Sequence, residues 1–336
     1  MHRRLALKTL TAIALCAGFS ATAVAQDLTS ATLRLKWLAQ AQFAGFYVAV
    51  AKGYYKEEGI DLTINPGGPN LLTESLVASG ADTFGLSGGT DSVMAARSKG
   101  LPIVSIGVAH QITPSVFVAK KDGPVKTIED FKGKTVTTWF SGMQYVLQAV
   151  LTAEGIDPAD VNMQPQQVSM TPFIEGQSDV ATATRYNELY TVYQAIPPEE
   201  ITTFVTEDYG VSFPRDTLIV NEETLADDPE LVEGFLRASI KGWIYAFQNP
   251  EEAVDIVMEA APTLNRDHQV YQLAEIKKLM LAGAVPENGL FYIDYDKIQS
   301  AHDLLVEGGM LPAPVDLKAA FVSGPLAAIP TEDKLP

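Results

Sequence analysis

Residues 33–69 read LRLKWLAQAQFAGFYVAVAKGYYKEEGIDLTINPGGP, and this stretch decides the fold. Residues 33–37 alternate apolar and polar side chains with the period of two that is typical of a β-strand. From Phe43 to Tyr54, aromatic and apolar side chains recur three, four and seven residues apart, which indicates a helix, and Gly59 is placed to end it. Residues 60–64 return to a period of two. The stretch therefore predicts a βαβ unit whose two strands are parallel.

The end of the first predicted strand is also the first candidate for a ligand site. In open parallel sheets, ligands bind beyond the carboxyl ends of the strands. Trp37 stands at such an end, and Gln40 and Gln42 lie in the loop that opens the predicted helix. We therefore expect this loop to face a ligand.

The amino terminus has the features of a secretory signal peptide. Basic residues at the start lead into the apolar run 9–19, which is too short for a permanent membrane-spanning helix. Ala23-Val24-Ala25 fits the small-x-small rule for cleavage, so residues 1–25 are expected to be removed. Arg3-Arg4 leaves the twin-arginine route open beside the general secretory route. Cys16 does not follow a small residue, so we expect a soluble, cleaved protein without a lipid anchor.

Composition places further limits on the protein. The only cysteine among the 336 residues lies in the predicted signal peptide, so no disulfide or thiol chemistry is expected after export. The remaining length, with hydrophobic residues making up 47% of the sequence, favours two lobes over one. The formal charge of -17 becomes -20 when Arg3, Arg4 and Lys8 are removed. This charge argues against nucleic acid and anionic membrane surfaces as partners.

Strand and helix patterns continue along the chain in two series. The first series comprises helix 70–79, strand 82–87, helix 92–99 and strand 103–108, whose continuous apolar run is typical of a parallel strand covered on both faces. A strand at 115–120 precedes a break at 122–124, after which a second series begins. That series comprises strands 136–139, 161–168, 179–184 and 201–206 and helices 143–154, 171–175 and 186–194. The restart predicts a second lobe.

The remainder of the chain is predicted to return to the first lobe and to cover it. Residues 211–220 indicate a returning strand, and amphipathic helices are expected at 229–247, 250–260, 266–282 and 295–307. The predicted division is a first lobe of residues 26–115 and 216–336 and a second lobe of residues 116–215. Strands near 115–120 and 211–220 would join the lobes as a two-strand hinge. The predicted fold class is α/β.

Catalytic motifs are not evident in the sequence. His110, His268 and His302 stand alone, without the spacing of a metal site, and the last two fall in helical surface patterns where a solvated, structural role is expected. Ser141-Gly142 lacks the G-x-S-x-G elbow, and Gly88-Gly89 is neither a P-loop nor a dinucleotide motif. A glycine-rich turn that opens a helix can still offer backbone N–H groups to a polar ligand. We therefore expect a binding site without metal or cofactor.

Aromatic side chains point to a planar ligand. Trp37 and Trp139 each stand at the end of the leading strand of a predicted lobe, so closure of the two lobes would bring them to one cleft. Tyr145 and Tyr186 stand at predicted helix starts on the same side. A planar ligand that stacks on such rings gains about 0.5–1.5 kcal/mol per pair beyond the burial of area. The alternative is that these aromatic residues fill the core.

Glu188 is the candidate polar anchor. It lies just after a predicted strand and inside the first turn of a helix, where the helix dipole favours an ionised carboxylate. It could accept paired hydrogen bonds from the amino group and ring nitrogen of an aminopyrimidine, each worth about 1.5–3 kcal/mol. In the alternative interpretation, the carboxylate pairs with Arg185 or caps its own helix.

Seven segments of the sequence resemble a known family. They are KWLAQAQFAGFYVA (36–49), KGYYKEEGIDL (52–62), DFKGKTV (130–136), EGQSDVA (175–181), YNELY (186–190), DYGV (208–211) and KGWIYAFQNPEEAV (241–254). The chain resembles the substrate-binding proteins of ABC importers in the nitrate, sulfonate, taurine and thiamine-precursor group. It is also similar to the fungal thiamine-pyrimidine synthase. The resemblance implies the two-lobe type II periplasmic binding protein fold, with mostly parallel sheets, helices on both faces and a two-strand hinge.

The resemblance also implies a function. A periplasmic, monomeric protein would capture a thiamine pyrimidine precursor, such as formylaminopyrimidine or hydroxymethylpyrimidine, between closing lobes and deliver it to a permease driven by a cytoplasmic ATPase. Within this family, the tryptophan after the first strand stacks on the pyrimidine and the acidic residue of Y-N-E contacts its amino edge, which corresponds to Trp37 and Glu188. The expected ligand contacts are Trp37, Gln42, Ser87, Gly88, Trp139, Ser141, Tyr145, Tyr186, Asn187, Glu188 and Tyr209.

Three other functions remain open at this point. A relative with similar motifs binds riboflavin, and other members of the group bind nitrate, sulfonates or taurine. The third alternative is a pyrimidine-forming enzyme of the fungal type, which carries a cysteine-rich, iron-associated motif and consumes one of its histidines. This chain reads TTWFSG after Val136 and has no cysteine beyond residue 16. We therefore expect a binding protein and not an enzyme.

Overall fold

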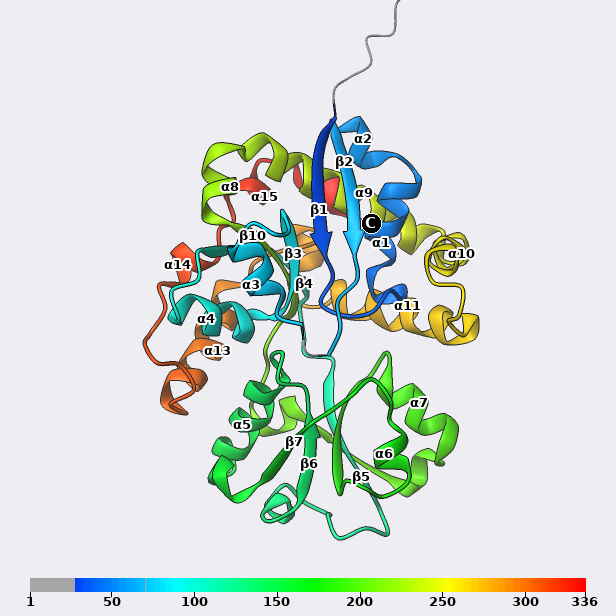
Figure 1. Ribbon diagram of the computed structural model, residues 1–336, viewed down its shortest axis with the longest axis vertical. Coiled ribbons are helices and arrows are strands. Elements are labelled where there is room, and N and C mark those ends of the chain that lie inside the picture. The colour runs from blue at the N-terminus through cyan, green and yellow to red at the C-terminus, as the bar shows by residue number, and fades with distance from the viewer. Residues whose placement is uncertain (1–27, 70) are drawn as a thin grey trace, which may run out of the picture.

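Two five-stranded sheets, one above the other in Figure 1, form the framework of the protein. The computed structural model describes residues 28–69 and 71–336, so the predicted signal peptide, residues 1–25, lies outside the described residues. The strand order is β2-β1-β3-β10-β4 in the first sheet and β7-β6-β8-β5-β9 in the second. We call each sheet with the helices packed on it the first and the second lobe. The α/β class and the two-lobe architecture agree with the prediction.

The bounds of the elements are as follows. The strands are β1 Thr29–Arg34, β2 Ile60–Asn65, β3 Phe84–Gly89, β4 Ile103–His110, β5 Ser115–Lys120, β6 Thr135–Thr138, β7 Asn162–Pro165, β8 Val180–Thr184, β9 Ile201–Val205 and β10 Arg215–Asn221. The helices are α1 Ala44–Ala51, α2 Tyr54–Glu57, α3 Thr73–Ala78, α4 Thr90–Ser98, α5 Met143–Ala153, α6 Thr171–Ile174, α7 Glu188–Ala195, α8 Glu222–Asp227, α9 Pro229–Gln248, α10 Pro250–Ala260, α11 Arg266–Met280, α12 Val285–Asn288, α13 Tyr295–Glu307, α14 Leu317–Ala320 and α15 Gly324–Ala327.

Among the described strands of each sheet, one runs opposite to the others. It is β10 in the first sheet, antiparallel to β3 and β4, and β5 in the second, antiparallel to β8 and β9. The reversal follows from the path of the chain. Strand β4 runs toward the second sheet, and β5 continues in that sheet away from the first. On the return, β9 runs toward the first sheet, and β10 continues in it away from the second. Strand β4 therefore pairs with an antiparallel neighbour, although its apolar run indicated a parallel one. Its eight residues are all buried, as such a run requires.

The chain crosses between the sheets at residues 111–114 and 206–214. The predicted hinge strands lie beside these crossings, but β5 and β10 each belong to one sheet only. The first sheet contains strands from 29–110 and 215–221, and the second contains strands from 115–205. The exact limits of the lobes, at 115/116 and 215/216, stay a prediction.

The segment that decides the fold forms the predicted βαβ unit with two differences. β1 and β2 are parallel over their full lengths, from Thr29 opposite Ile60 to Arg34 opposite Asn65. The first strand begins earlier than predicted and leaves Trp37 in the loop beyond it. The single predicted helix is divided into a 3₁₀ turn at Ala41–Phe43 and the helices α1 and α2, because Gly53 between them adopts φ 77°. Gly59, with φ 75°, ends α2 as predicted.

Two glycines allow helices α1 and α9 to pack closely. A Cβ atom on Gly45 would lie 2.3 Å from the Trp243 ring, and one on Gly242 would lie 2.1 Å from the Gly45 carbonyl oxygen. Both distances are below van der Waals contact, so any side chain would force the helices apart. Trp243 is fully buried in the main core of the first lobe and packs edge-to-face on Phe46. These glycines therefore explain the segments FAGFY and KGWIY as a helix–helix contact.

Gly242→Ala tests this packing. We expect the variant to lose about 1–3 kcal/mol of unfolding free energy or more, because the added methyl group meets backbone atoms of α1 that cannot move independently. Urea unfolding followed by circular dichroism measures the loss. Gly234→Ala, on the same helix, is the matched control, since its Cβ would lie 3.2 Å from its nearest neighbour, Glu58 Cβ, and not 2.1 Å from a backbone oxygen. Equal stability of the two variants would contradict the close-packing explanation.

Within residues 28–69 and 71–336, we find no helix with both the length and the apolar character needed to cross a membrane.

Candidate functional site

A pocket lies between the lobes, at the ends of the strands that point toward the cleft. Its volume, measured as the space open to the centre of a water molecule, is about 60 Å³. The first lobe lines it with Lys36, Trp37, Gln40, Gln42, Leu71, Thr73, Glu74, Gly88 and Arg215, and the crossing and second lobe with Pro114, Ser115, Trp139, Ser141, Met143, Thr184, Tyr186, Asn187 and Glu188.

The structure brings most of the sequence-predicted contact residues to this pocket. Those that line it are Trp37, Gln42, Gly88, Trp139, Ser141, Tyr186, Asn187 and Glu188. Ser87 is buried and not among the lining residues, but it contacts one of them, Glu74. Gly88 and Gly89 end strand β3 instead of forming the predicted turn, and α4 follows directly at Thr90. The pocket is therefore where the strand-end rule placed it.

Tyr145 and Tyr209 were expected at the pocket, and the structure places both elsewhere. Tyr145 lines a neighbouring pocket, because it stands two residues after Met143 on α5, and helical residues two apart face different sides. Tyr209 ends the 3₁₀ turn Thr206–Tyr209 in the second crossing and packs against an apolar cluster that includes residues of α5. The direction of each side chain, set by the helix for Tyr145 and by the crossing for Tyr209, accounts for both differences.

Two tryptophans close the pocket from opposite lobes. Trp37 follows β1 and Trp139 follows β6, and their ring centroids lie 5.3 Å apart at an interplanar angle of 70°. This is an edge-to-face contact, one of the preferred arrangements of aromatic pairs. The predicted meeting of the two rings at one cleft is confirmed, and in this closed arrangement the rings contact each other directly.

Other contacts between the lobes flank the pocket. Tyr190 of α7 stacks on His268 of α11 with centroids 4.4 Å apart, and the Tyr271 hydroxyl donates to the Arg185 carbonyl at 3.0 Å. On another side, Gly88 approaches the backbone of Ser141 so closely that a Cβ would lie 3.0 Å from its carbonyl oxygen. The lobes therefore touch at several places around the pocket.

Glu188 is held by groups of its own lobe. It opens α7, is buried, and accepts hydrogen bonds from the Thr184 N–H (3.0 Å), the Thr184 hydroxyl (2.6 Å) and the Asn187 side-chain amide (2.7 Å). Arg185 pairs with Glu207 instead, and no side-chain cap forms at the start of α7, so neither alternative role of Glu188 is observed. Burial raises the pKa of Glu188 and so opposes the expected effect of the helix dipole. A carboxylate has about four acceptor positions, so capacity for a ligand donor remains.

A second carboxyl group, Glu74, was missed by the sequence analysis. It stands in the first turn of α3, is 7% exposed, lines the pocket and accepts a hydrogen bond from the Ser87 hydroxyl at 2.5 Å. Burial raises its pKa as well. The signal for it is an acidic residue at the start of a helix that follows a glycine- and proline-rich loop. That signal is weak, because the loop's path to the pocket is not visible locally.

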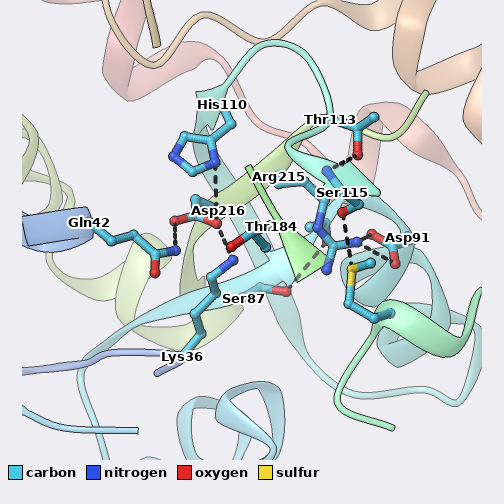
Figure 2. A network of polar contacts seen from close by, with 12 residues as sticks. Lys36, Gln42, Ser87, Asp91, His110, Thr113, Ser115, Thr184, Arg215 and Asp216 are labelled. Carbon is cyan, nitrogen blue, oxygen red and sulfur yellow. Dashed lines mark hydrogen bonds and ion pairs between the residues drawn. The ribbon is translucent and has the colours of Figure 1, made fainter. Parts of the chain in front are cut away.

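Asp216 joins the pocket loop to both crossings of the chain, as Figure 2 shows. Its carboxylate forms an ion pair with Lys36, accepts a hydrogen bond from the Gln42 side chain at 2.6 Å and lies 3.5 Å from His110 Nδ1. Burial alone would raise the pKa of Asp216, but His110, Lys36 and Gln42 outweigh it and hold the pKa below its ordinary value. Burial lowers the pKa of Lys36, and Asp216 partly offsets this.

Arg215 is the second cation that lines the pocket, and it is also paired. Its Nη1 atom lies 2.8 and 2.9 Å from the two carboxylate oxygens of Asp91 at the start of α4, and both residues are buried. Lys36 and Arg215 are therefore each neutralised by a carboxylate, while Glu74 and Glu188 face the pocket and form no ion pair with any cation of residues 28–69 and 71–336. The site is consequently better suited to a neutral ligand rich in hydrogen-bond donors than to a small anion.

The predicted solvated role of His268 and His302 is wrong. His302 is 9% exposed, and its Nε2 accepts a hydrogen bond from the Val315 N–H at 3.1 Å. His268 is half-buried under Tyr190. The local pattern assigned these faces of α11 and α13 to solvent, but α11 packs against Tyr190 there and α13 contacts the backbone of Val315. Within the described parts of the chain, no group of three or more His, Cys, Asp or Glu residues is arranged to hold a metal ion.

His110→Gln tests the protonation state of the Asp216 cluster. Burial lowers the pKa of His110 to about 4 from an ordinary value of 6.5, so the unfolded chain binds this proton first as the pH falls. Stability is therefore lost between about pH 6.5 and pH 4, and His110 alone accounts for about 2 kcal/mol between pH 7 and pH 4.5. Urea unfolding at both values should show a smaller loss in the variant. An equal loss in both proteins would mean that His110 is already charged when folded.

Comparison with known proteins identifies the family. The family model described as NMT1/THI5 like matches residues 40–253. The riboflavin-binding protein RibY of Chloroflexus aurantiacus is 30% identical over 88% of this chain and 86% of that protein. The formylaminopyrimidine-binding protein of Halalkalibacterium halodurans is 30% identical over 69% and 71%. The 4-amino-5-hydroxymethyl-2-methylpyrimidine phosphate synthase of Legionella pneumophila is 31% identical over 69% and 74%.

Solved structures confirm the fold. The periplasmic nitrate-binding protein NrtA from Synechocystis PCC 6803 superposes with a TM-score of 0.69 at 14% identity and covers 92% of this chain and 91% of that one. The alkanesulfonate-binding protein SsuA from Xanthomonas axonopodis pv. citri reaches 0.65 at 14% identity, covering 87% and 97%. At these identities the likeness shows the architecture alone. The fold, the family model and the relatives at 30% identity together show that this chain belongs to the NMT1/THI5-like family and has the periplasmic binding protein fold.

Proposed function

We propose that the protein is the extracytoplasmic solute-binding component of an ABC importer and captures a thiamine pyrimidine precursor between its lobes. The observation that carries the proposal is a pocket closed by Trp37 and Trp139 and lined by two buried carboxyl groups, Glu74 and Glu188. A formylaminopyrimidine-binding relative supports the ligand class. A permease and its cytoplasmic ATPase would be the partners, and release to them would be reversible.

The chemistry of the pocket suits an aminopyrimidine. An aromatic ring that enters between Trp37 and Trp139 would exchange their mutual contact for two ring contacts of its own, each worth about 0.5–1.5 kcal/mol beyond burial. Glu188 can accept from the exocyclic amino group. Its carboxylate has about four acceptor positions, and three hydrogen bonds within the protein leave room for such a donor.

The size of the pocket separates the candidate ligands. The space open to the centre of a water molecule, about 60 Å³, favours a compact single-ring ligand over riboflavin, which has three fused rings and a ribityl chain. Nitrate, an anion, and taurine, a zwitterion whose sulfonate needs a cationic partner, are disfavoured for a different reason. Both cations at the pocket already pair with Asp91 and Asp216, and the remaining carboxyl groups would repel a negative charge when ionised.

Riboflavin is the second candidate, and two observations favour it. The riboflavin-binding relative aligns over a larger share of this chain than the pyrimidine-binding one. A neighbouring pocket of about 200 Å³ shares Glu74 and Ser141 with the first, so an outward shift of the loop at Ser141 would join the two. A larger ring system would then have room without a change of fold.

Calorimetric titration of the protein tests the proposal. Formylaminopyrimidine and hydroxymethylpyrimidine should bind one-to-one, and riboflavin, nitrate and taurine should not. Glu188→Gln should weaken pyrimidine binding about 10–150-fold, because a charge-assisted hydrogen bond of about 1.5–3 kcal/mol is replaced. Trp37→Ala should weaken it at least about threefold through the lost ring contact.

The controls use the two tyrosines that lie outside the pocket. Tyr145→Phe and Tyr209→Phe should bind the pyrimidines like the wild type. Saturable binding of riboflavin alone would replace the pyrimidine assignment with the second candidate. Conversion of the ligand, or a mass loss at a histidine detected by mass spectrometry after incubation with iron, would overturn the binding-protein role in favour of an enzyme.

A further inference from the structure

Thr73 and Glu74, at the start of α3, form a polar pair on the first-lobe wall of the pocket. Both side chains line the pocket, and they are 2% and 7% exposed. They come from the lobe that faces Glu188, which stands on α7 of the second lobe. Neither residue belongs to the segments that mark the family resemblance, and neither was predicted from the sequence. A ligand in the pocket therefore meets hydrogen-bonding groups from both lobes.

The Thr73 hydroxyl has no hydrogen-bond partner in the structure. It does not cap its helix, because the N-cap position of α3 is Leu72 and no side-chain cap is formed there. The methyl group of Thr73 packs against strand β3, where it lies within 2.5 Å of the position a Cβ on Gly85 would take. The side chain is therefore anchored by its methyl group, while its buried hydroxyl, at the wall of the pocket, keeps its hydrogen-bonding capacity. Buried polar groups in folded proteins are rarely left without a partner.

Glu74 is positioned by Ser87 and keeps capacity for another donor. The Ser87 hydroxyl donates to Oε1 at 2.5 Å, and this is the side-chain hydrogen bond that the structure gives Glu74. A carboxylate has about four acceptor positions. By contrast, Glu188 already accepts three hydrogen bonds from Thr184 and Asn187. The first-lobe carboxyl group is therefore the less occupied of the two.

We propose that Thr73 and Glu74 bind a hydroxyl or amide group on a second edge of the ligand. Glu74 accepts a hydrogen bond from this group, and the Thr73 hydroxyl donates one to its oxygen. The inference rests on the proposed function and narrows the ligand class. The ligand is a small planar heterocycle that offers an amino group to Glu188 and a substituent with both a donor and an acceptor to the first lobe. Ser87 is a positioning residue that acts through Glu74.

This arrangement also couples the ligand to closure of the lobes. Glu188 and Trp139 belong to the second lobe, and Glu74 and Trp37 belong to the first. A ring that lacks the second substituent can engage Glu188 but leaves the first-lobe pair unsatisfied. A ligand shifts a conformational equilibrium only through its different affinity for the two states. The second substituent is therefore expected to decide how well the closed form is held.

A ligand-by-variant comparison tests the inference. Calorimetric titration is done with 4-amino-5-hydroxymethyl-2-methylpyrimidine and with its analogue 4-amino-2,5-dimethylpyrimidine, which lacks the hydroxyl. The wild type should bind the hydroxymethyl compound at least about tenfold more tightly. In the double variant Thr73→Val/Glu74→Gln, this ratio should fall below about threefold, because the groups that recognise the hydroxyl are altered. A ratio that stays at the wild-type value in the double variant would overturn the inference.

Two further variants separate specific from general effects. Glu188→Gln should weaken the binding of both compounds by a similar factor and leave the ratio of their affinities unchanged, since it acts on the amino group that they share.

Ser87→Ala should lower the ratio without removing a pocket contact, which covers the case in which the double variant does not fold. A ratio unchanged in Ser87→Ala would contradict its positioning role. If neither compound binds the wild type, the proposed function itself fails, which is distinct from binding without selectivity for the hydroxyl.

Discussion

One buried carboxylate, at the place where the chain returns to the first sheet, holds together the first-lobe segments that border the pocket. Asp216 adopts φ 55°, a left-handed conformation that aspartate tolerates better than most residues. Lys36 after β1, Gln42 before α1 and His110 at the end of β4 all reach it. Removing one partner from a buried ion pair typically costs about 3–5 kcal/mol. The same group therefore holds the pocket loop and the ends of both crossings in one geometry, and it leaves Lys36 unable to attract an anion at full strength.

Several contacts between protein side chains join the two lobes in this structure. Trp37 meets Trp139, Tyr190 meets His268, and an apolar cluster continues from α4 and β4 into α5. A ligand therefore competes with contacts that the closed lobes already make to each other. Its net contribution is the difference between its own contacts and those it displaces, so selectivity rests on polar groups that the protein leaves unsatisfied. The aromatic rings supply affinity for many planar molecules, whereas the carboxyl groups and the Thr73 hydroxyl distinguish among them.

Much of the fold was visible in the sequence because period-two strands and glycine stops are local features. Gly59 ended its helix as predicted, and Trp37 and Trp139 reached the pocket because both stand at strand ends that the topology brings together. The reversed strands were not visible, since strand direction follows from the path of the whole chain. Glu74 was missed because its importance depends on where a loop turns, and Tyr145 was misplaced because a helix start does not specify which side a residue faces. The local patterns thus located the site but did not identify all of the residues that line it.

The close contact of Gly45 with Gly242 bears on how relatives of this protein are to be interpreted. The most recognisable segments of the sequence, FAGFY and KGWIY, meet at the back of the first lobe, where a helix pair requires them irrespective of cargo. These two segments therefore carry information about the helix contact and not about the ligand. Residues 71, 73, 74, 141 and 143 line the pocket and lie outside these segments, so differences there are the ones that would accompany a change of ligand.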